Sequence, residues 1–167
     1  MPSDALALVA VAGTGGTGAA IDLFTRRVPN PLTLATTALG FTLAATQLSG
    51  LTLGQAAGGF CIGLALMLPG HVIGRTGAGD VKLFAALGTL LGPSRIGMAF
   101  LYTAIAGGAL ALIVASSRGS LTRAVGRTAD LIRTGGRSAA EIEAASDNRC
   151  PYAPAIACGA IAAALGF

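Results

Sequence analysis

Long uncharged stretches separated by short polar ones make up most of the chain. Residues 5–21 contain no charged side chain, and neither do residues 28–70, which are long enough for two membrane spans divided near Ser49-Gly50. Because a transmembrane helix needs about 17 to 25 mostly apolar residues, the pattern predicts an all-α, polytopic bundle of about six transmembrane helices. The remaining apolar segments lie between Lys82 and Pro93, over 96–117 and over 150–167.

The composition points in the same direction. Hydrophobic residues make up 53% of the 167-residue chain and charged residues only 11%, whereas a soluble domain carries about 25% charged residues. We therefore expect a single integral membrane domain over 1–167. The three cysteines, Cys61, Cys150 and Cys158, show no CxxC or Cys/His spacing, so we predict neither a metal site nor a cofactor.

The basic residues are distributed unevenly across the predicted spans. Under the six-helix scheme all of them fall on one side of the membrane except Arg95. The positive-inside rule makes the crowded side cytoplasmic and places both termini outside. The polar segment 116–149 is then a cytoplasmic loop, in which apolar spacing over 121–132 suggests an in-plane amphipathic helix against membrane lipids. Topology already accounts for the arginines, so no nucleic-acid partner is expected.

Two aspartates stand at the ends of predicted spans. Asp22 ends the first span and Asp80 begins the fourth on the same side, so the scheme puts both at one depth. Two carboxylates close together in a partly dehydrated place cannot both ionise easily, which leaves one acid and one base for a single water. Aspartic-protease chemistry requires such a pair. Alternatively, each aspartate caps a helix or pairs with an arginine, as Asp22 could with Arg26 one turn later.

The stretches around these aspartates resemble a known family. "GAGDVKLFAALGTLLG", which contains Asp80, resembles the GxGD signature of the type IV prepilin peptidases. "IDLFTRRVPNPLTL", which contains Asp22, resembles the other motif of that family, and "PYAPAIACGA" is similar to its closing helix. The resemblance covers nearly the whole chain. It implies a GxGD-type membrane aspartyl protease in which Asp22 and Asp80 are the catalytic pair.

The resemblance also implies a substrate and a location. Prepilins and pseudopilins carry a short basic leader, which the family removes at the cytoplasmic face of a bacterial or archaeal plasma membrane, usually after a glycine and before a hydrophobic helix. The small size is similar to that of the compact members associated with Flp/Tad-type pili and protein secretion. Larger relatives have a cysteine-bearing cytoplasmic domain and also N-methylate the new terminus. No CxxC pair occurs here, so methylation is not expected.

Several neighbours of Asp80 are candidates for shaping the site. Gly77 and Gly79 would let the backbone turn sharply, or approach a substrate closely, just before Asp80. If the φ angle of Gly79 is positive, a side chain there would be strained. Lys82 is expected to snorkel to lipid phosphates, or else to bias the aspartate pair towards ionisation.

Two proline-containing turns supply the other candidates. Pro29 and Asn30 lie between the first two spans, where Asn30 is expected to cap the second helix and the turn to hold Asp22 in place. Pro151 and Tyr152 open the last span. The prolines there leave backbone groups free, which could hold an extended substrate strand beside the aspartates or simply start the helix.

Small residues give the third span a face for close packing. Gly54 and Gly58 form one GxxxG pair, and Gly59 and Gly63 form a second. Such pairs let transmembrane helices approach closely. His71, the one histidine, is expected in the loop that follows this span, which makes a Ser-His-Asp hydrolase improbable.

Two functions of other classes remain as alternatives. A small proton-coupled transporter would also carry intramembrane acids, although these would lie nearer the middle of a span, often within internal repeats. A non-catalytic subunit of a secretion assembly would tolerate loss of either aspartate.

Overall fold

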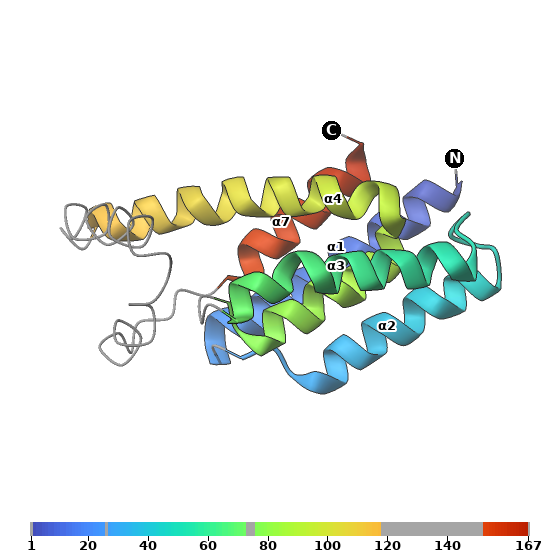
Figure 1. The fold of residues 1–167 in the computed structure, drawn as a ribbon, viewed down its shortest axis with the longest axis horizontal. Helices are drawn as coiled ribbons and strands as arrows, with labels where there is room; N and C mark the ends of the chain where they lie inside the picture. The colour runs from blue at the N-terminus through green and yellow to red at the C-terminus, as the bar shows by residue number, and fades with distance from the viewer. Residues whose placement is uncertain (1, 26, 73–75, 118–151, 167) are drawn as a thin grey trace.

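The computed structural model describes residues 2–25, 27–72, 76–117 and 152–166. The secondary structure of this part is entirely helical, which confirms the predicted all-α fold (Figure 1). The loop and in-plane helix predicted within 116–149 lie, except for the first two residues, outside the described residues. The helices are α1 (Pro2–Thr25), α2 (Asn30–Ala45), α3 (Leu53–Val72), α4 (Ala78–Ser117) and α7 (Ala153–Leu165).

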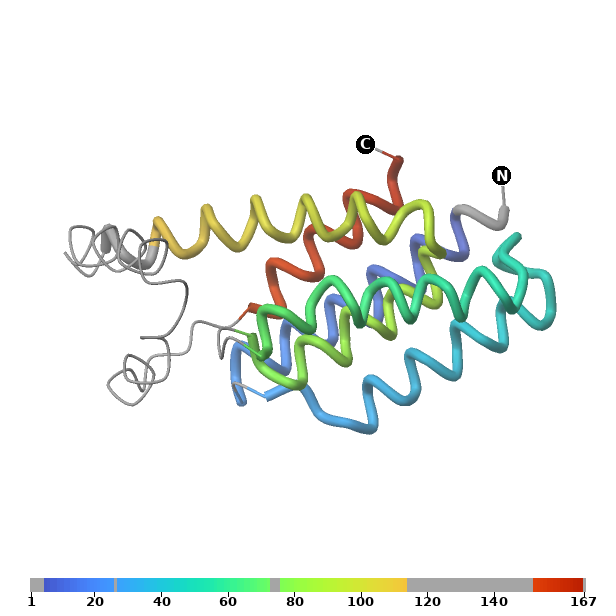
Figure 2. The backbone as a smooth tube through the Cα atoms, in the orientation of Figure 1, coloured from blue at the N-terminus to red at the C-terminus, as the bar shows by residue number. Residues whose placement is uncertain are grey.

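The longest helix, α4, is broken in its interior and contains two of the predicted segments. Gly92 has φ 71° and ψ 175°, outside the helical region, and Pro93 follows it without a backbone N–H to donate. The chain reverses direction at this point, as the tube in Figure 2 shows. We call residues 78–91 the first arm of α4 and residues 93–117 its second arm. With the two arms counted separately, each of the six predicted apolar segments has a helix.

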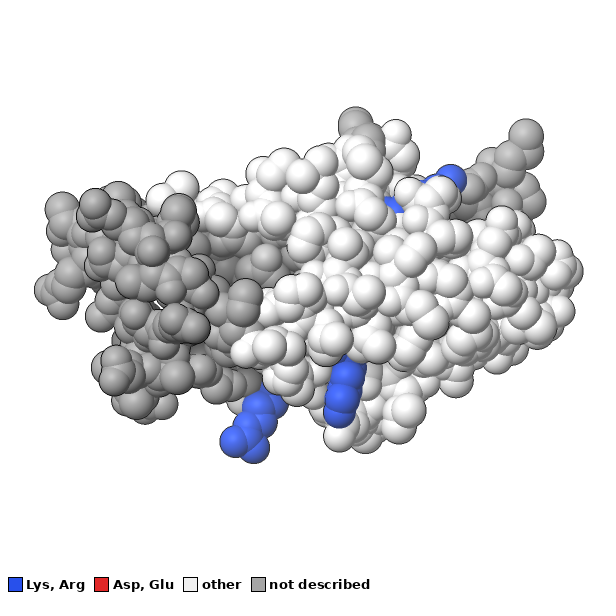
Figure 3. All heavy atoms as spheres, in the orientation of Figure 1, with Lys and Arg blue, Asp and Glu red and all other residues white. Residues whose placement is uncertain are grey.

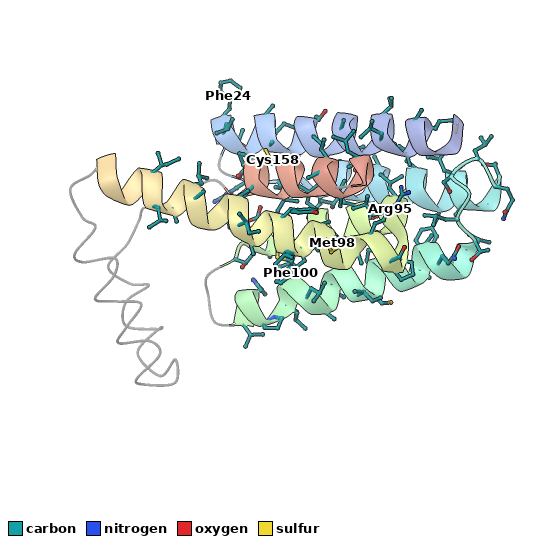
Figure 4. The ribbon with its side chains drawn as sticks, turned by 90° about the horizontal axis from the view of Figure 1, so that it is seen from above. Phe24, Arg95, Met98, Phe100 and Cys158 are labelled. Carbon is teal, nitrogen blue, oxygen red and sulfur yellow. The ribbon has the colours of Figure 1, made fainter. Side chains whose placement is uncertain are left out.

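Among the described residues, three helical stretches are long and apolar enough to cross a membrane: Ala5–Thr25, Leu53–Val72 and Ala78–Ile113, the last of which contains both arms of α4. Large apolar side chains also point outwards, among them Phe24, which projects away from the bundle in Figure 4 and is 88% exposed. The face drawn in Figure 3 is accordingly almost free of charged side chains over the described residues. An apolar exterior of this kind is expected where lipid tails, rather than water, surround the helices. The protein is a multi-pass membrane protein.

The first arm of α4 forms the centre of the molecule. Leu83, Phe84 and Leu87 have no exposed surface, because α2, α3 and the second arm all pack around this arm. Phe84 meets Phe100 of the second arm edge to face, with ring centroids 6.1 Å apart. The last helix, α7, packs against α1 and α4. The start of α4, which carries Asp80, is therefore held on several sides.

Close packing of α3 on the first arm depends on glycine, as predicted, but at one GxxxG pair only. A Cβ atom on Gly59 would overlap the backbone carbonyl of Gly88, and one on Gly63 would lie 3.1 Å from the Phe84 carbonyl oxygen. A Cβ atom on Gly58 would make an ordinary 3.9 Å contact with Pro93. The pair Gly59–Gly63, rather than Gly54–Gly58, therefore forms the contact between the two helices.

The expected loop position of His71 is wrong. The helix α3 continues through Val72, so His71 lies in its last turn, with Pro69 inside the same helix. The imidazole is exposed, as expected, and its Nδ1 lies 2.9 Å from the carbonyl oxygen of Thr76. This contact ties the end of α3 to the segment just before α4.

Candidate active site

Asp22 lies near the end of α1 and is 5% exposed. Its Oδ2 accepts a hydrogen bond from the backbone N–H of Ala153, at 3.3 Å. Ala153 is the first residue of α7, and N–H groups in the first turn of a helix have no partner within that helix. The carboxylate therefore satisfies a free donor of α7 and is fixed in position between two helices distant in sequence.

Asp80 lies in the first turn of α4, close to the residue that caps it. The backbone N–H groups of Asp80 and Val81 donate to the Gly77 carbonyl oxygen, at 3.0 Å and 3.2 Å. The Asp80 carboxylate in turn accepts a hydrogen bond from the backbone of Gly77. Asp80 thus supplies the acidic half of a capping box, while Gly77 has no side chain to supply the other half, and this contact holds the acidic side chain at the start of the helix. A Cβ atom on Gly77 would lie only 3.2 Å from Asp80 Oδ2, so glycine keeps this side of the carboxylate open.

Gly79 brings α4 against the connection between α1 and α2. A Cβ atom there would lie 3.1 Å from the Cβ of Val28 and 3.3 Å from its carbonyl oxygen. The positive φ considered for Gly79 is not observed: among the described glycines, only Gly50, Gly92 and Gly166 have one. Close approach, rather than an unusual backbone angle, is therefore what this position requires of glycine.

The two predicted aspartates lie at one pocket. It has a volume of about 210 Å³, room for several waters, since each water takes up about 30 Å³ in the liquid. The two carboxylates are close enough to interact electrostatically. A pair of carboxylates beside a few waters can carry out general acid–base hydrolysis. The described residues that line the pocket come from both motif stretches: Asp22, Arg27, Val28, Gly77, Ala78, Gly79 and Asp80.

Tyr152 lies next to this pocket, at the N-cap of α7. Burial and the negative charge of Asp80 raise the pKa of its hydroxyl above the usual value of 10. The ring covers Gly107 of the second arm of α4, where a Cβ atom would come within 2.5 Å of the ring edge. Tyr152 thus connects the second arm to the aspartates, whereas Pro151 lies outside the described residues.

The other candidates lie beside the pocket rather than in it. Pro29 is the N-cap residue of α2, and no side chain caps that helix, so the prediction that Asn30 caps it is wrong. Asn30 is instead the first helical residue, and its Oδ1 accepts a hydrogen bond from Lys82 Nζ at 3.1 Å. Residues two apart on a helix do not face each other. Lys82 therefore points away from Asp80, towards α2.

Two features of the pocket were not predicted from the sequence. Arg27 lines the pocket, but the sequence indicated only that its positive charge helps to orient the chain in the membrane. The N–H of Ala153 carries no sequence signal, since every residue other than proline has one. The alternative pairing of Asp22 with Arg26 involves a residue outside the described part.

A family model described as the type IV leader peptidase family matches residues 9–112. The match covers more than half of the chain and includes both aspartates and both stretches that form the pocket. No curated protein and no solved structure matches the chain.

Proposed function

The chain belongs to the type IV leader peptidase family, and from that premise we propose that it is a prepilin peptidase. In this proposal it is a membrane aspartyl endopeptidase that removes the short basic leader from prepilins and pseudopilins at the cytoplasmic face of the plasma membrane. Asp22 and Asp80 are its catalytic residues. The observation that carries the proposal is the pocket in which the two aspartates meet, each anchored by a backbone N–H.

The proposed reaction uses the two carboxylates in complementary states. The ionised carboxylate takes a proton from a water in the pocket while the water oxygen attacks the carbonyl carbon of the scissile peptide bond. The protonated carboxylic acid then gives its proton to the leaving nitrogen, and the C–N bond breaks. Two acids that share one proton can supply both steps, and they exchange roles between one turnover and the next.

The walls of the pocket fit an extended peptide as the substrate. Gly77 lines the pocket beside Asp80 and has no side chain, so a peptide backbone could approach Asp80 closely. Tyr152 stands beside the pocket at the start of α7. We propose that these residues, with Pro29 and Pro151 in the flanking turns, position the peptide and the aspartates.

The cytoplasmic location of the site is supported by the basic residues. Arg27 lines the pocket itself, whereas Arg95 lies just after the Gly92 turn, where the first arm of α4 ends. The positive-inside rule assigns the end that carries most of the lysine and arginine to the cytoplasm.

The test is cleavage of a purified prepilin by the purified full-length protein. Asp22→Asn and Asp80→Asn should each lower the cleavage rate at least about 100-fold, because each removes one half of the acid–base pair. Asp4→Asn, at the opposite end of α1, is the matched control and should cleave normally. The thermal melting of all three variants should be measured alongside, so that loss of activity is separated from loss of fold.

Normal cleavage by either aspartate variant would rule out the aspartyl-protease mechanism. A transporter or an assembly subunit would instead give a folded wild-type protein with no cleavage at all.

A further inference from the structure

A second cavity lies on the side of the bundle, between α2, α3 and the first arm of α4. Its volume is about 350 Å³, within the range of about 300–1,000 Å³ typical of sites for small molecules. It shares none of its described lining residues with the aspartate pocket. The residues that line it are Asn30, Thr33, Leu34, Thr37, Phe60, Leu64, Lys82 and Ala85.

The cavity is polar at one end and apolar along the rest of its length. Asn30, the first residue of α2, and Lys82, the fifth residue of α4, are hydrogen-bonded to each other and form the polar end. Leu34, Phe60 and Leu64 line the rest.

The two threonines in the lining do not change this polarity. Thr33 donates to the Asn30 carbonyl oxygen at 2.9 Å, and Thr37 donates to the Thr33 carbonyl oxygen at 2.8 Å. Since both hydroxyls are satisfied within α2, they need no partner in the cavity.

The polar end carries a positive charge. Among the described residues that line the cavity, Lys82 is the one charged group, and no acidic side chain accompanies it. A lysine ammonium has three donors, and the hydrogen bond to Asn30 uses one of them. The remaining donors and the uncompensated charge favour an anionic group, with which they would form charge-assisted hydrogen bonds.

The apolar part opens to the surroundings rather than to the core. Leu34 is 69% exposed and Leu64 is 36% exposed, and both belong to helices whose outer faces are apolar. In a membrane protein this flank faces lipid. A lipid tail can therefore enter the cavity sideways, without crossing the helices.

We propose that this cavity binds an anionic phospholipid of the membrane. Its phosphate is held by the Lys82 ammonium and the Asn30 side-chain amide, and one acyl chain lies along Leu34, Phe60 and Leu64. The lipid then links the first turn of α2 to the second turn of α4. Both segments lie near the contact of Val28 with Gly79, so a bound lipid stabilises the wall of the aspartate pocket from behind.

A substrate peptide fits this cavity less well than a lipid. Asp80 and Lys82 lie on different faces of α4, and the two cavities share no described lining residue. A peptide bound at the aspartates would have to pass around the start of α2 to enter the cavity. A lipid needs no such path.

The test is lipid retention by the purified full-length protein, measured by native mass spectrometry after exposure to vesicles of phosphatidylglycerol or of phosphatidylcholine. We expect the wild type to retain one phosphatidylglycerol at least tenfold more often than one phosphatidylcholine. Lys82→Gln should lower phosphatidylglycerol retention at least tenfold, whereas the control Arg95→Gln should leave it unchanged. Inorganic phosphate, which lacks a chain, should not displace the lipid.

A second pair of variants tests the apolar part. Leu34→Trp should fill the cavity and lower retention, whereas Leu39→Trp, an exposed position on the same helix that does not line the cavity, should not. Equal retention by Lys82→Gln and wild type would overturn the proposal. So would equal loss in the two tryptophan variants, or displacement of the lipid by a peptide with the apolar segment of a prepilin.

Discussion

Gly79 illustrates, at the scale of one residue, how a missing side chain positions a neighbouring carboxylate. Its Cα lies so close to Val28 that even an added methyl group would press against the side chain and backbone of Val28. Asp80 follows directly, and Val28 is linked to Asp22 by the last turn of α1. The contact between Gly79 and Val28 therefore sets how the two aspartates lie relative to each other.

Gly79→Val should accordingly inactivate the enzyme while leaving the protein folded. The branched side chain would push α4 away from the Val28 connection and move Asp80 relative to Asp22. Misplacement of about 1 Å can lower a rate about 100-fold, so we expect a loss of that size in prepilin cleavage. The control is Gly97→Val, a glycine of the same helix with open space around its Cα.

Cleavage rate and melting temperature should be measured for both variants. A fully active Gly79→Val variant would show that the contact with Val28 does not position the two aspartates. Equal loss of activity in Gly97→Val would show that any valine in α4 is harmful.

The sequence predicted the two aspartates of the pocket better than their surroundings. Asp22 and Asp80 could be paired because each stands at the end of a long apolar segment, and the ends of such segments lie at predictable depths. The hydrogen bond between Lys82 and Asn30 could not be predicted. It depends on α2 beginning at Asn30 rather than one residue later, and helix boundaries are the least certain part of a sequence-based prediction.

At the scale of the helices, the contact between α3 and the first arm of α4 holds the centre of the molecule together. Gly59 and Gly88 bring the two backbones into direct contact. A contact this close gains packing energy from many backbone atoms, and such packing drives helix association in a membrane. The first arm carries Asp80 at its start, so this contact also supports the site.

Gly59→Val should therefore destabilise the protein, by about 1 to 3 kcal/mol or more, as expected for overpacking of a dense interface. Gly58→Val introduces the same side chain one position away, where the space allows it, and should cost less than about 1 kcal/mol. The measurement is the amount of folded protein in the membrane together with its melting temperature in detergent. If the two variants melt alike, the contact between Gly59 and Gly88 contributes little to stability.

The break in α4 was predictable from sequence, and the end of α3 was not. Gly92 and Pro93 are a strong signal together, because glycine permits the positive φ that is observed and proline cannot donate to the preceding turn. His71 was expected in the loop that follows α3. The helix continues to Val72 instead, as transmembrane helices tolerate proline when other groups satisfy the freed carbonyl.

At the scale of the whole molecule, the helices alternate in direction so that two ends can be distinguished. In Figure 1, α1 begins and α7 ends at the same end of the molecule, which agrees with an even number of crossings. The opposite end holds the last turn of α1 and the first turns of α4 and α7, where the aspartate pocket lies. The described residues of the pocket therefore lie together at one end of the bundle.

Reporter fusions should place that end in the cytoplasm. Fusions after Arg27, Arg75 and Arg137 should report a cytoplasmic position, and fusions after Gly50 or at Phe167 an external one, because the six-span scheme puts all basic residues except Arg95 on one side. Arg95, which follows the Gly92 turn, supplies the control. Lysines added next to it should make the orientation of the protein in the membrane less uniform, without moving any helix boundary. A cytoplasmic Phe167 would mean that one crossing fails. The first arm of α4, with 14 residues from 78 to 91, and α7, with 13 residues, are both too short to span about 30 Å of hydrocarbon on their own. An external Arg27 would be more serious, since the pocket would then face away from the compartment in which prepilin leaders are proposed to be cut.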